Sequence, residues 1–156
     1  MIGPYFFENE AGNAVTVNGV RHHYMITEFL WPQLDGMDME DMWFQQDAAT
    51  CHSARETTEL LREKFPGRVI SRNVDQEWPP RSRDLTPCDF FLWAFVESRA
   101  HSNKPQTIRD LKAEIRRVIG EIEPQLCGTV VASFVKRARV CQQSHGGHLS
   151  DTVLHN

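Results

Sequence analysis

The sequence predicts an α/β fold, because short apolar segments alternate with longer segments of helical periodicity. Aromatic and β-branched residues favour strands in four segments, at residues 2–8, 14–17, 42–46 and 68–71. Apolar residues three or four positions apart predict a helix from about residue 107 to 122. A chain of 156 residues, 40% hydrophobic and 24% charged, has the size and composition of one globular domain.

The N-terminal part predicts a β-hairpin followed by a helix. Residues 2–8 and 14–17 are expected to pair around the polar turn between them. Asn18 is a candidate N-cap for a helix over residues 20–31. The residues with apolar helical spacing in that segment are Tyr24, Thr27 or Glu28, and Trp31.

The middle of the chain predicts a strand, a helix and a second strand. The strand at 42–46 delivers Asp47 at its carboxyl end, which is where open α/β sheets carry their sites. Ser53 and Glu56 have the spacing of a capping box at the start of the next helix. Pro66 and Gly67 end that helix before the strand at 68–71.

Helices dominate the second half of the predicted fold. After a polar loop, a helix from about residue 87 to 99 is apolar around most of its circumference, which predicts deep burial. Thr107 with Asp110 resembles a second capping box, and Pro124 is typical of a first helical position. The residues expected to face inward on the last helix are Leu126, Val130, Phe134 and Ala138.

Composition and charge exclude several classes of protein. No apolar segment approaches the roughly 20 residues of a membrane span, and residues 1–30 lack the pattern of a secretory signal. The four cysteines are widely spaced, which favours reduced thiols over a zinc ribbon. A net charge of −4 argues against binding DNA through overall charge, although a nuclease core can still concentrate basic residues locally.

Two aspartates stand in distinctive local sequences. Asp47 lies in residues 43–52, Trp-Phe-Gln-Gln-Asp-Ala-Ala-Thr-Cys-His. Asp89 lies in residues 78–93, Trp-Pro-Pro-Arg-Ser-Arg-Asp-Leu-Thr-Pro-Cys-Asp-Phe-Phe-Leu-Trp. Carboxylates presented from the ends of packed elements suit Mg²⁺, which takes oxygen ligands in rigid geometry.

These two segments resemble the catalytic domain of mariner-type DDE/D transposases, closest to the insect-type members. The resemblance extends from Gly-Pro-Tyr-Phe-Phe-Glu at 3–8 to His-Gly-Gly-His-Leu at 145–149. It implies a ribonuclease-H-like fold, a mixed sheet flanked by helices and truncated at the N-terminus, with a C-terminal helical pair. It also implies that Asp47 is the second catalytic acid and Asp89 the third. The 41 residues between them exceed the family's usual gap, which an insertion at 72–78 would explain.

The resemblance covers only the C-terminal part of such an enzyme. The family's first catalytic aspartate and its helix-turn-helix region lie upstream of the segment that matches residues 3–8. We therefore expect residues 1–100 to be a partial ribonuclease-H-like domain. Residues 101–143 would be the C-terminal helices of the same domain, and 144–156 a flexible tail.

The implied chemistry is cut-and-paste DNA transposition, with phosphodiester cleavage and strand transfer at two divalent metal ions. Asp47 and Asp89 would bind Mg²⁺ or Mn²⁺, provided that the site is functional. The implied partner is double-stranded DNA, as transposon ends and target, in the nucleus, and a second copy of the chain is a further candidate partner. No membrane or small-molecule substrate is expected. With two of three acids, the chain is expected to be inactive alone.

Each candidate residue also has a structural interpretation. Asp47 could be a hydrogen-bonded turn aspartate, and Asp89 a first-turn acid that interacts with the helix dipole. Asp84, the rival of Asp89, more readily bonds the local backbone. His52 could orient DNA or the acid, or be a neutral structural histidine. Ala48 replaces the family's usual glycine, at a cost of about 1 kcal/mol if the backbone there needs positive φ.

Basic and aromatic residues near Asp89 are candidates for DNA contact. Trp78 could stack on bases, and Arg81 and Arg83 could pair with phosphate, although a solvated loop is the alternative. A last basic group is expected on the wet face of the final helix, with DNA contact as the lesser interpretation: Lys136, Arg137 and Arg139.

Two other functions stay open from the sequence. The chain could be a non-catalytic DNA-binding or dimerisation module derived from a transposon, acting through its 107–141 helices. It could instead be a metal-dependent nuclease that recruits another acid, such as Glu8. Metal dependence of DNA cleavage distinguishes these two hypotheses.

Overall fold

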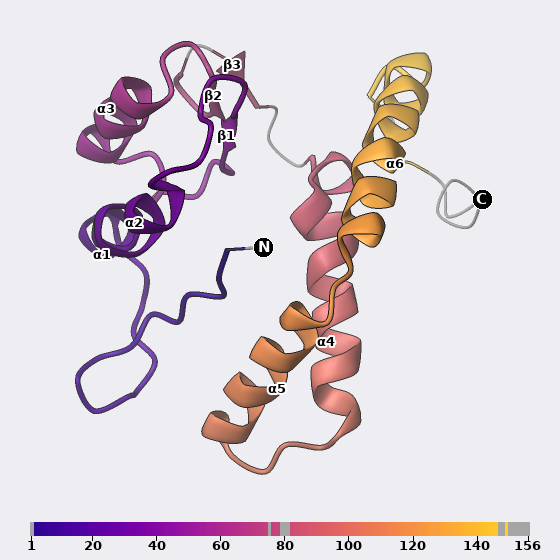
Figure 1. Ribbon diagram of the computed structural model, residues 1–156. Coiled ribbons are helices and arrows are strands. Elements are labelled where there is room, and N and C mark those ends of the chain that lie inside the picture. The colour runs from indigo at the N-terminus through magenta and orange to yellow at the C-terminus, as the bar shows by residue number, and fades with distance from the viewer. Residues whose placement is uncertain (1, 75, 79–81, 147–148, 150–156) are drawn as a thin grey trace. The chain divides into compact units, whose positions relative to one another are not determined.

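A computed structural model shows that the protein has mixed α/β structure. The structure describes residues 2–74, 76–78, 82–146 and 149. The chain divides into two compact units (Figure 1). The N-terminal unit is Ile2–Arg81, and the C-terminal unit begins at Ser82. The boundary expected at residue 100 falls inside helix α4 (Trp93–Ser102).

The N-terminal unit contains a three-stranded parallel sheet in the order β1-β2-β3. The strands are β1 (Phe44–Gln45), β2 (Val69–Ser71) and β3 (Gln76–Glu77). Phe44 is in register with Val69, and Ile70 with Gln76. The strands predicted at 42–46 and 68–71 are therefore confirmed in shorter form, whereas β3 was not predicted, since its residues are polar.

The hairpin predicted at 2–8 and 14–17 is present only as a turn with a single antiparallel bridge, and these residues form no strands. One antiparallel bridge joins Glu8 to Ala14, and the Asn9 side chain closes the turn by accepting from the backbone at residues 11 and 13. The aromatic side chains pack elsewhere: the Tyr5 ring lies 4.9 Å from Phe7 and 5.0 Å from Phe29. Packing onto the following helix therefore takes the place of a strand ladder.

A continuous helical segment follows Asn18, whose side chain accepts from the Arg21 N–H as predicted. It comprises α1 (Gly19–Tyr24), the π-helical η1 (Met25–Leu30) and α2 (Trp31–Leu34). Tyr24, one of the residues at helical spacing in this segment, is 59% exposed. The buried residues are His22, Ile26 and Leu34, spaced by multiples of four, because the wide π-helical turn shifts the inward face.

The core of the N-terminal unit lies between this segment, α3 (Arg55–Lys64) and β2. Its buried residues are Ile26, Leu34, Leu61, Phe65, Val69 and Val74. The Arg68 guanidinium donates to the backbone carbonyls of Met39, Glu40 and Met42, which fixes the loop that leads into β1. This packing places the carboxyl end of β1 beside α1.

The predicted capping box at Ser53 is wrong. Helix α3 begins at Arg55 after Ala54, and no side chain caps it. The Ser53 hydroxyl instead donates back to the Ala49 carbonyl at 3.1 Å. The Ser53 hydroxyl, which was predicted to cap the helix, therefore stabilises the turn that follows Asp47.

The C-terminal unit is helical in its described part. It contains η2 (Arg83–Leu85), η3 (Cys88–Leu92), α4, α5 (Ile108–Gly120) and α6 (Pro124–Gln143). Figure 1 shows α5 alongside α4, and their contact forms a core of Val96, Ala100, Val118 and Ile119. The predicted Thr107 cap is confirmed, because its hydroxyl accepts from the Asp110 N–H at 3.1 Å. The start of α6 at Pro124 is also confirmed.

Two burial predictions in this unit are wrong. The 87–99 helix is not deeply buried around its circumference: Trp93 is 59% exposed, and only one side of the helix faces α5. Arg137 is not on a wet face, because it is 4% exposed. Its Nη1 donates to the Asp84 carbonyl at 3.1 Å, and its guanidinium carbon lies 4.0 Å from the centroid of the Phe90 ring.

Among the described residues, no single helix combines the length and the apolar composition needed to cross a membrane. Helices α5 and α6 meet at an 80° bend, and only when they are taken together do they have the length and the apolar composition of a membrane span.

Candidate functional site

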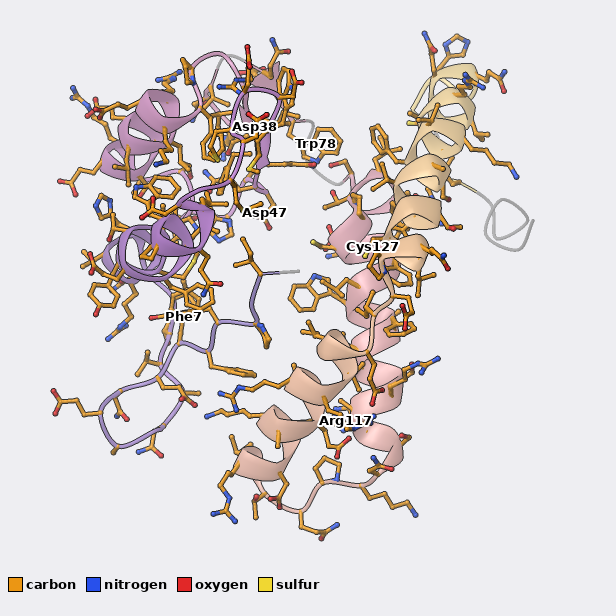
Figure 2. The ribbon with its side chains drawn as sticks, in the orientation of Figure 1. Phe7, Asp38, Asp47, Trp78, Arg117 and Cys127 are labelled. Atoms are coloured by element: carbon orange, nitrogen blue, oxygen red, sulfur yellow. The ribbon has the colours of Figure 1, made fainter. Side chains whose placement is uncertain are left out.

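Asp47 directly follows β1 at its carboxyl end. The preceding Gln46 is buried, and its N–H donates to the Ile70 carbonyl at 3.0 Å, so the sheet continues up to Asp47. The Asp47 side chain is 63% exposed. Asp47 therefore follows a strand at its carboxyl end, as the sequence predicted, and its carboxylate is accessible to solvent on the N-terminal unit (Figure 2).

One oxygen of this carboxylate is held by two donors. Asp47 Oδ1 accepts the Ala49 N–H at 3.0 Å and lies 2.5 Å from His52 Nδ1. Because an ionised carboxylate only accepts, His52 must carry its proton on Nδ1. Oδ2 accepts no hydrogen bond from the described part of the chain. The turn interpretation of Asp47 is thus borne out, and it leaves one oxygen open to a ligand.

His52 is itself held from two sides. Gln46 Nε2 donates to the His52 carbonyl at 3.0 Å, which closes the loop between these residues. The ring of His22 lies 4.2 Å from the His52 ring, centroid to centroid, with 35° between the planes. The sequence interpretation missed His22. The available signal was its spacing of four from Ile26, which marks the buried side of the helix.

Burial keeps His22 neutral near pH 7. The pKa of His22 is lowered from 6.5 to about 4, mainly by desolvation and in addition by the neighbouring His52. The charge of Asp47 opposes this shift. The two imidazole rings, which are tilted relative to each other, are therefore in contact without a charge on His22.

Alanine at position 48 carries no left-handed backbone strain. Among the described residues other than glycine, positive φ occurs at Asn73, Lys104 and His145. Ala48 is not one of them, so the cost expected for replacing glycine does not arise.

Asp89 lies at the start of the η3–α4 helical segment and is exposed. Its N–H donates to the Thr86 carbonyl at 2.8 Å, as a residue in a first turn does. The Thr86 hydroxyl donates back to Ser82 and does not cap the helix. The rival Asp84 lies in η2, where its carbonyl accepts from Arg137.

The candidate DNA-contacting residues are divided between the two units. Trp78 is half-buried just after β3, and its N–H donates to the Ser71 carbonyl at 3.1 Å. Arg83 is exposed in η2, within the C-terminal unit that also carries Asp89. The prediction for Arg81 lies outside the described residues. The structure brings together Asp47 and His52, within one unit.

The side chains around Asp47 supply only part of what a metal site requires. In the described ranges, no group of three or more His, Cys, Asp and Glu side chains is arranged to hold a metal ion. Asp47 fits a single oxygen ligand, because its position is fixed through Oδ1 and its Oδ2 is open. Any complete site would require further carboxylates beside Asp47.

Comparison with known proteins leaves the family of the chain open. No protein-family model matches the sequence, and no curated protein matches it significantly. The resemblance to mariner-type transposases therefore depends on the motifs around Asp47 and Asp89.

Proposed function

We propose that this chain is part of the ribonuclease-H-like catalytic domain of a mariner-type DDE/D transposase. In this proposal, Asp47 and Asp89 are ligands for Mg²⁺ or Mn²⁺. The observation that carries the proposal is the Asp47 carboxylate, which follows a parallel strand, is held through one oxygen and is open at the other. Parallel sheets place functional groups at this end of their strands.

In this proposal, each of the candidate side chains has its own role in phosphodiester chemistry. His52 fixes the orientation of Asp47, and Asp89 is exposed at a helix start, where a second ligand can be presented. Arg83 offers a planar fork of donors for a DNA phosphate, and Trp78 a surface for stacking on a base. When bound, the metal supplies Lewis-acid stabilisation of charge on the attacking and leaving oxygens.

The substrate class is double-stranded DNA, and the nucleus is the compartment that fits such a substrate. We expect the chain on its own to show little or no strand transfer. The resemblance implies three catalytic acids, of which Asp47 and Asp89 are two, and removing one member of such a cluster removes nearly all activity.

Paramagnetic Mn²⁺ tests the proposal directly, because it broadens NMR signals of residues close to a bound ion. We expect amide signals beside Asp47 and beside Asp89 to broaden over the same range of Mn²⁺ concentration. Asp47→Asn and Asp89→Asn should each weaken the broadening at both places by tenfold or more. This joint loss distinguishes a shared site from two independent surface carboxylates.

Asp38→Asn is the matched control. Asp38 is also an exposed turn aspartate, whose Oδ1 accepts the Glu40 N–H at 3.0 Å. It should leave Mn²⁺ broadening around Asp47 unchanged. Broadening that responds to Asp38→Asn as strongly as to Asp47→Asn would show general attraction to acidic loops and sink the proposal.

A non-catalytic module remains the second candidate, because α6 exposes apolar residues on one side. Val131 and Val135, spaced by one turn, are 61% and 48% exposed. This function predicts self-association or DNA binding that persists in EDTA. Sedimentation analysis of the wild type beside Val135→Asp would detect self-association through this surface.

A further inference from the structure

Helix α1 lies unusually close to the loop that follows Asp47. A Cβ atom on Gly19 would stand 3.0 Å from the Ala54 Cβ and 3.9 Å from the Cys51 carbonyl oxygen. The lack of a side chain at Gly19 thus permits this approach. The Asn18 cap fixes the start of the helix at the same place. The first turn of α1 is therefore held against the 51–54 loop.

His22 lies one turn further along α1 and faces the same loop. Its side chain is 4% exposed, and its ring contacts the ring of His52 over a centroid distance of 4.2 Å. His52 is 27% exposed and would have rotamer freedom without this contact. The His22 ring removes that freedom on one side, while the closed loop from Gln46 fixes the His52 backbone.

We propose that His22 is a positioning residue for Asp47, which acts by holding the His52 ring where Nδ1 donates to Asp47 Oδ1. The role of this contact in metal binding rests on the proposed function. The geometric part, from α1 through His52 to the carboxylate, stands on the contacts alone. Partners that orient a ligating carboxylate typically change metal affinity ten- to a hundredfold when they are removed.

The ring of His22, rather than its nitrogen chemistry, carries this role. His22 Nδ1 is buried and has no hydrogen-bond partner among the described residues. An unpartnered buried nitrogen costs stability, so its contribution must come from the flat ring against His52. Phenylalanine offers a flat ring of similar size at this position, whereas alanine leaves a gap beside His52.

The test compares His22→Ala with His22→Phe in the full chain, and uses His23→Ala as the control on the same helix. The first measurement is the pair of imidazole ¹⁵N shifts of His52, which report the proton on Nδ1. The second is the Mn²⁺ dissociation constant from broadening around Asp47. We expect His22→Ala to move the His52 shifts toward the average of both tautomers and to weaken Mn²⁺ binding about tenfold.

His22→Phe should keep both the His52 shifts and the Mn²⁺ affinity of the wild type, as should His23→Ala. If His22→Ala does not fold, His22→Phe still decides the matter: loss of the Nδ1 proton signal in that folded variant would overturn the role of the ring. Unchanged His52 shifts in a folded His22→Ala protein would overturn it too. Absence of Mn²⁺ binding in the wild type would instead refute the proposed function, and leave the shift measurement to judge the positioning.

Discussion

The Asp47 carboxylate combines a structural and a candidate chemical role in one side chain. Its Oδ1 closes the local turn and accepts from His52, and Oδ2 stays open. A carboxylate that is oriented by hydrogen bonds loses less freedom when it binds a cation. The structural interpretation of Asp47 and the metal interpretation are thus compatible, because they use different oxygens.

The lowered pKa of His22 should make the stability of the chain depend on pH. Its pKa is lowered to about 4 in the folded chain, so between pH 4 and 6.5 the unfolded chain binds more protons than the folded one. The free energy of unfolding should therefore fall as the pH falls through this window, by about 2 kcal/mol from pH 7 to pH 5.

Urea denaturation at several pH values measures this dependence. His22→Phe removes the titrating group. Between pH 7 and pH 5 the free energy of unfolding of this variant should therefore fall by about 2 kcal/mol less than that of the wild type. Equal pH dependence in the two proteins would show that His22 titrates normally in the folded chain.

At the scale of elements, one arginine joins α6 to the segment that carries Asp89. Arg137 is the buried residue of α6, and it contacts Phe90 and the Asp84 carbonyl. Burial is the main cause that lowers the pKa of Arg137, which the charge of Asp84 opposes. A charge is tolerated there because its guanidinium both donates a hydrogen bond and stacks on a ring.

Arg137→Ala should loosen α6. The loss of the cation–π contact and of the bond to Asp84 is expected to cost about 2 kcal/mol. Amide hydrogen exchange should accelerate along α6 and in η2 and η3. Arg139→Ala is the control, because Arg139 is an exposed arginine two residues further along the same helix, and it should leave exchange unchanged. Acceleration confined to the substituted residue would show that Arg137 does not anchor the helix.

The sequence predicted the elements whose signals are local. The caps at Asn18 and Thr107 and the start at Pro124 each depend on a few adjacent residues, and the structure has all three. Ser53 met the same local rule, but its hydroxyl bonds the preceding turn instead.

Other features depend on contacts between distant residues. The burial of Arg137 conflicts with the rule that charge runs are solvated, although its position three residues after Phe134 places it on the inward side. His22 became visible only once α1 was placed against the 51–54 loop. The sequence could therefore predict Asp47 and His52 as candidate site residues, but not the contact of His22 with His52.

At the scale of the whole chain, the two units have separate cores. One core runs from Ile26 to Val74, and the other from Val96 to Ile119, with no member in common. Within the described residues, each unit therefore buries its apolar side chains by itself. A unit of about 80 residues with a small core supports a stability of roughly 3–5 kcal/mol at most.

In the proposed function Asp47 and Asp89 bind the same ion, and the two residues belong to different units. The isolated N-terminal unit therefore tests the proposal, because it keeps Asp47 and lacks Asp89. We expect residues 1–81 expressed alone to keep the amide spectrum of their core, but to bind Mn²⁺ at least tenfold more weakly than the full chain. Mn²⁺ bound to the folded chain should also raise its stability in proportion to the logarithm of Mn²⁺ concentration.

Asp89→Asn in the full chain is the decisive comparison for this last prediction. It should reduce Mn²⁺ affinity to the level of the isolated N-terminal unit, because both lack the same ligand. Equal affinity in the isolated unit, the full chain and the Asp89→Asn variant would place the ion at Asp47 alone. The two acids would then be independent, and the argument for a shared catalytic centre would fail even though Asp47 bound a metal.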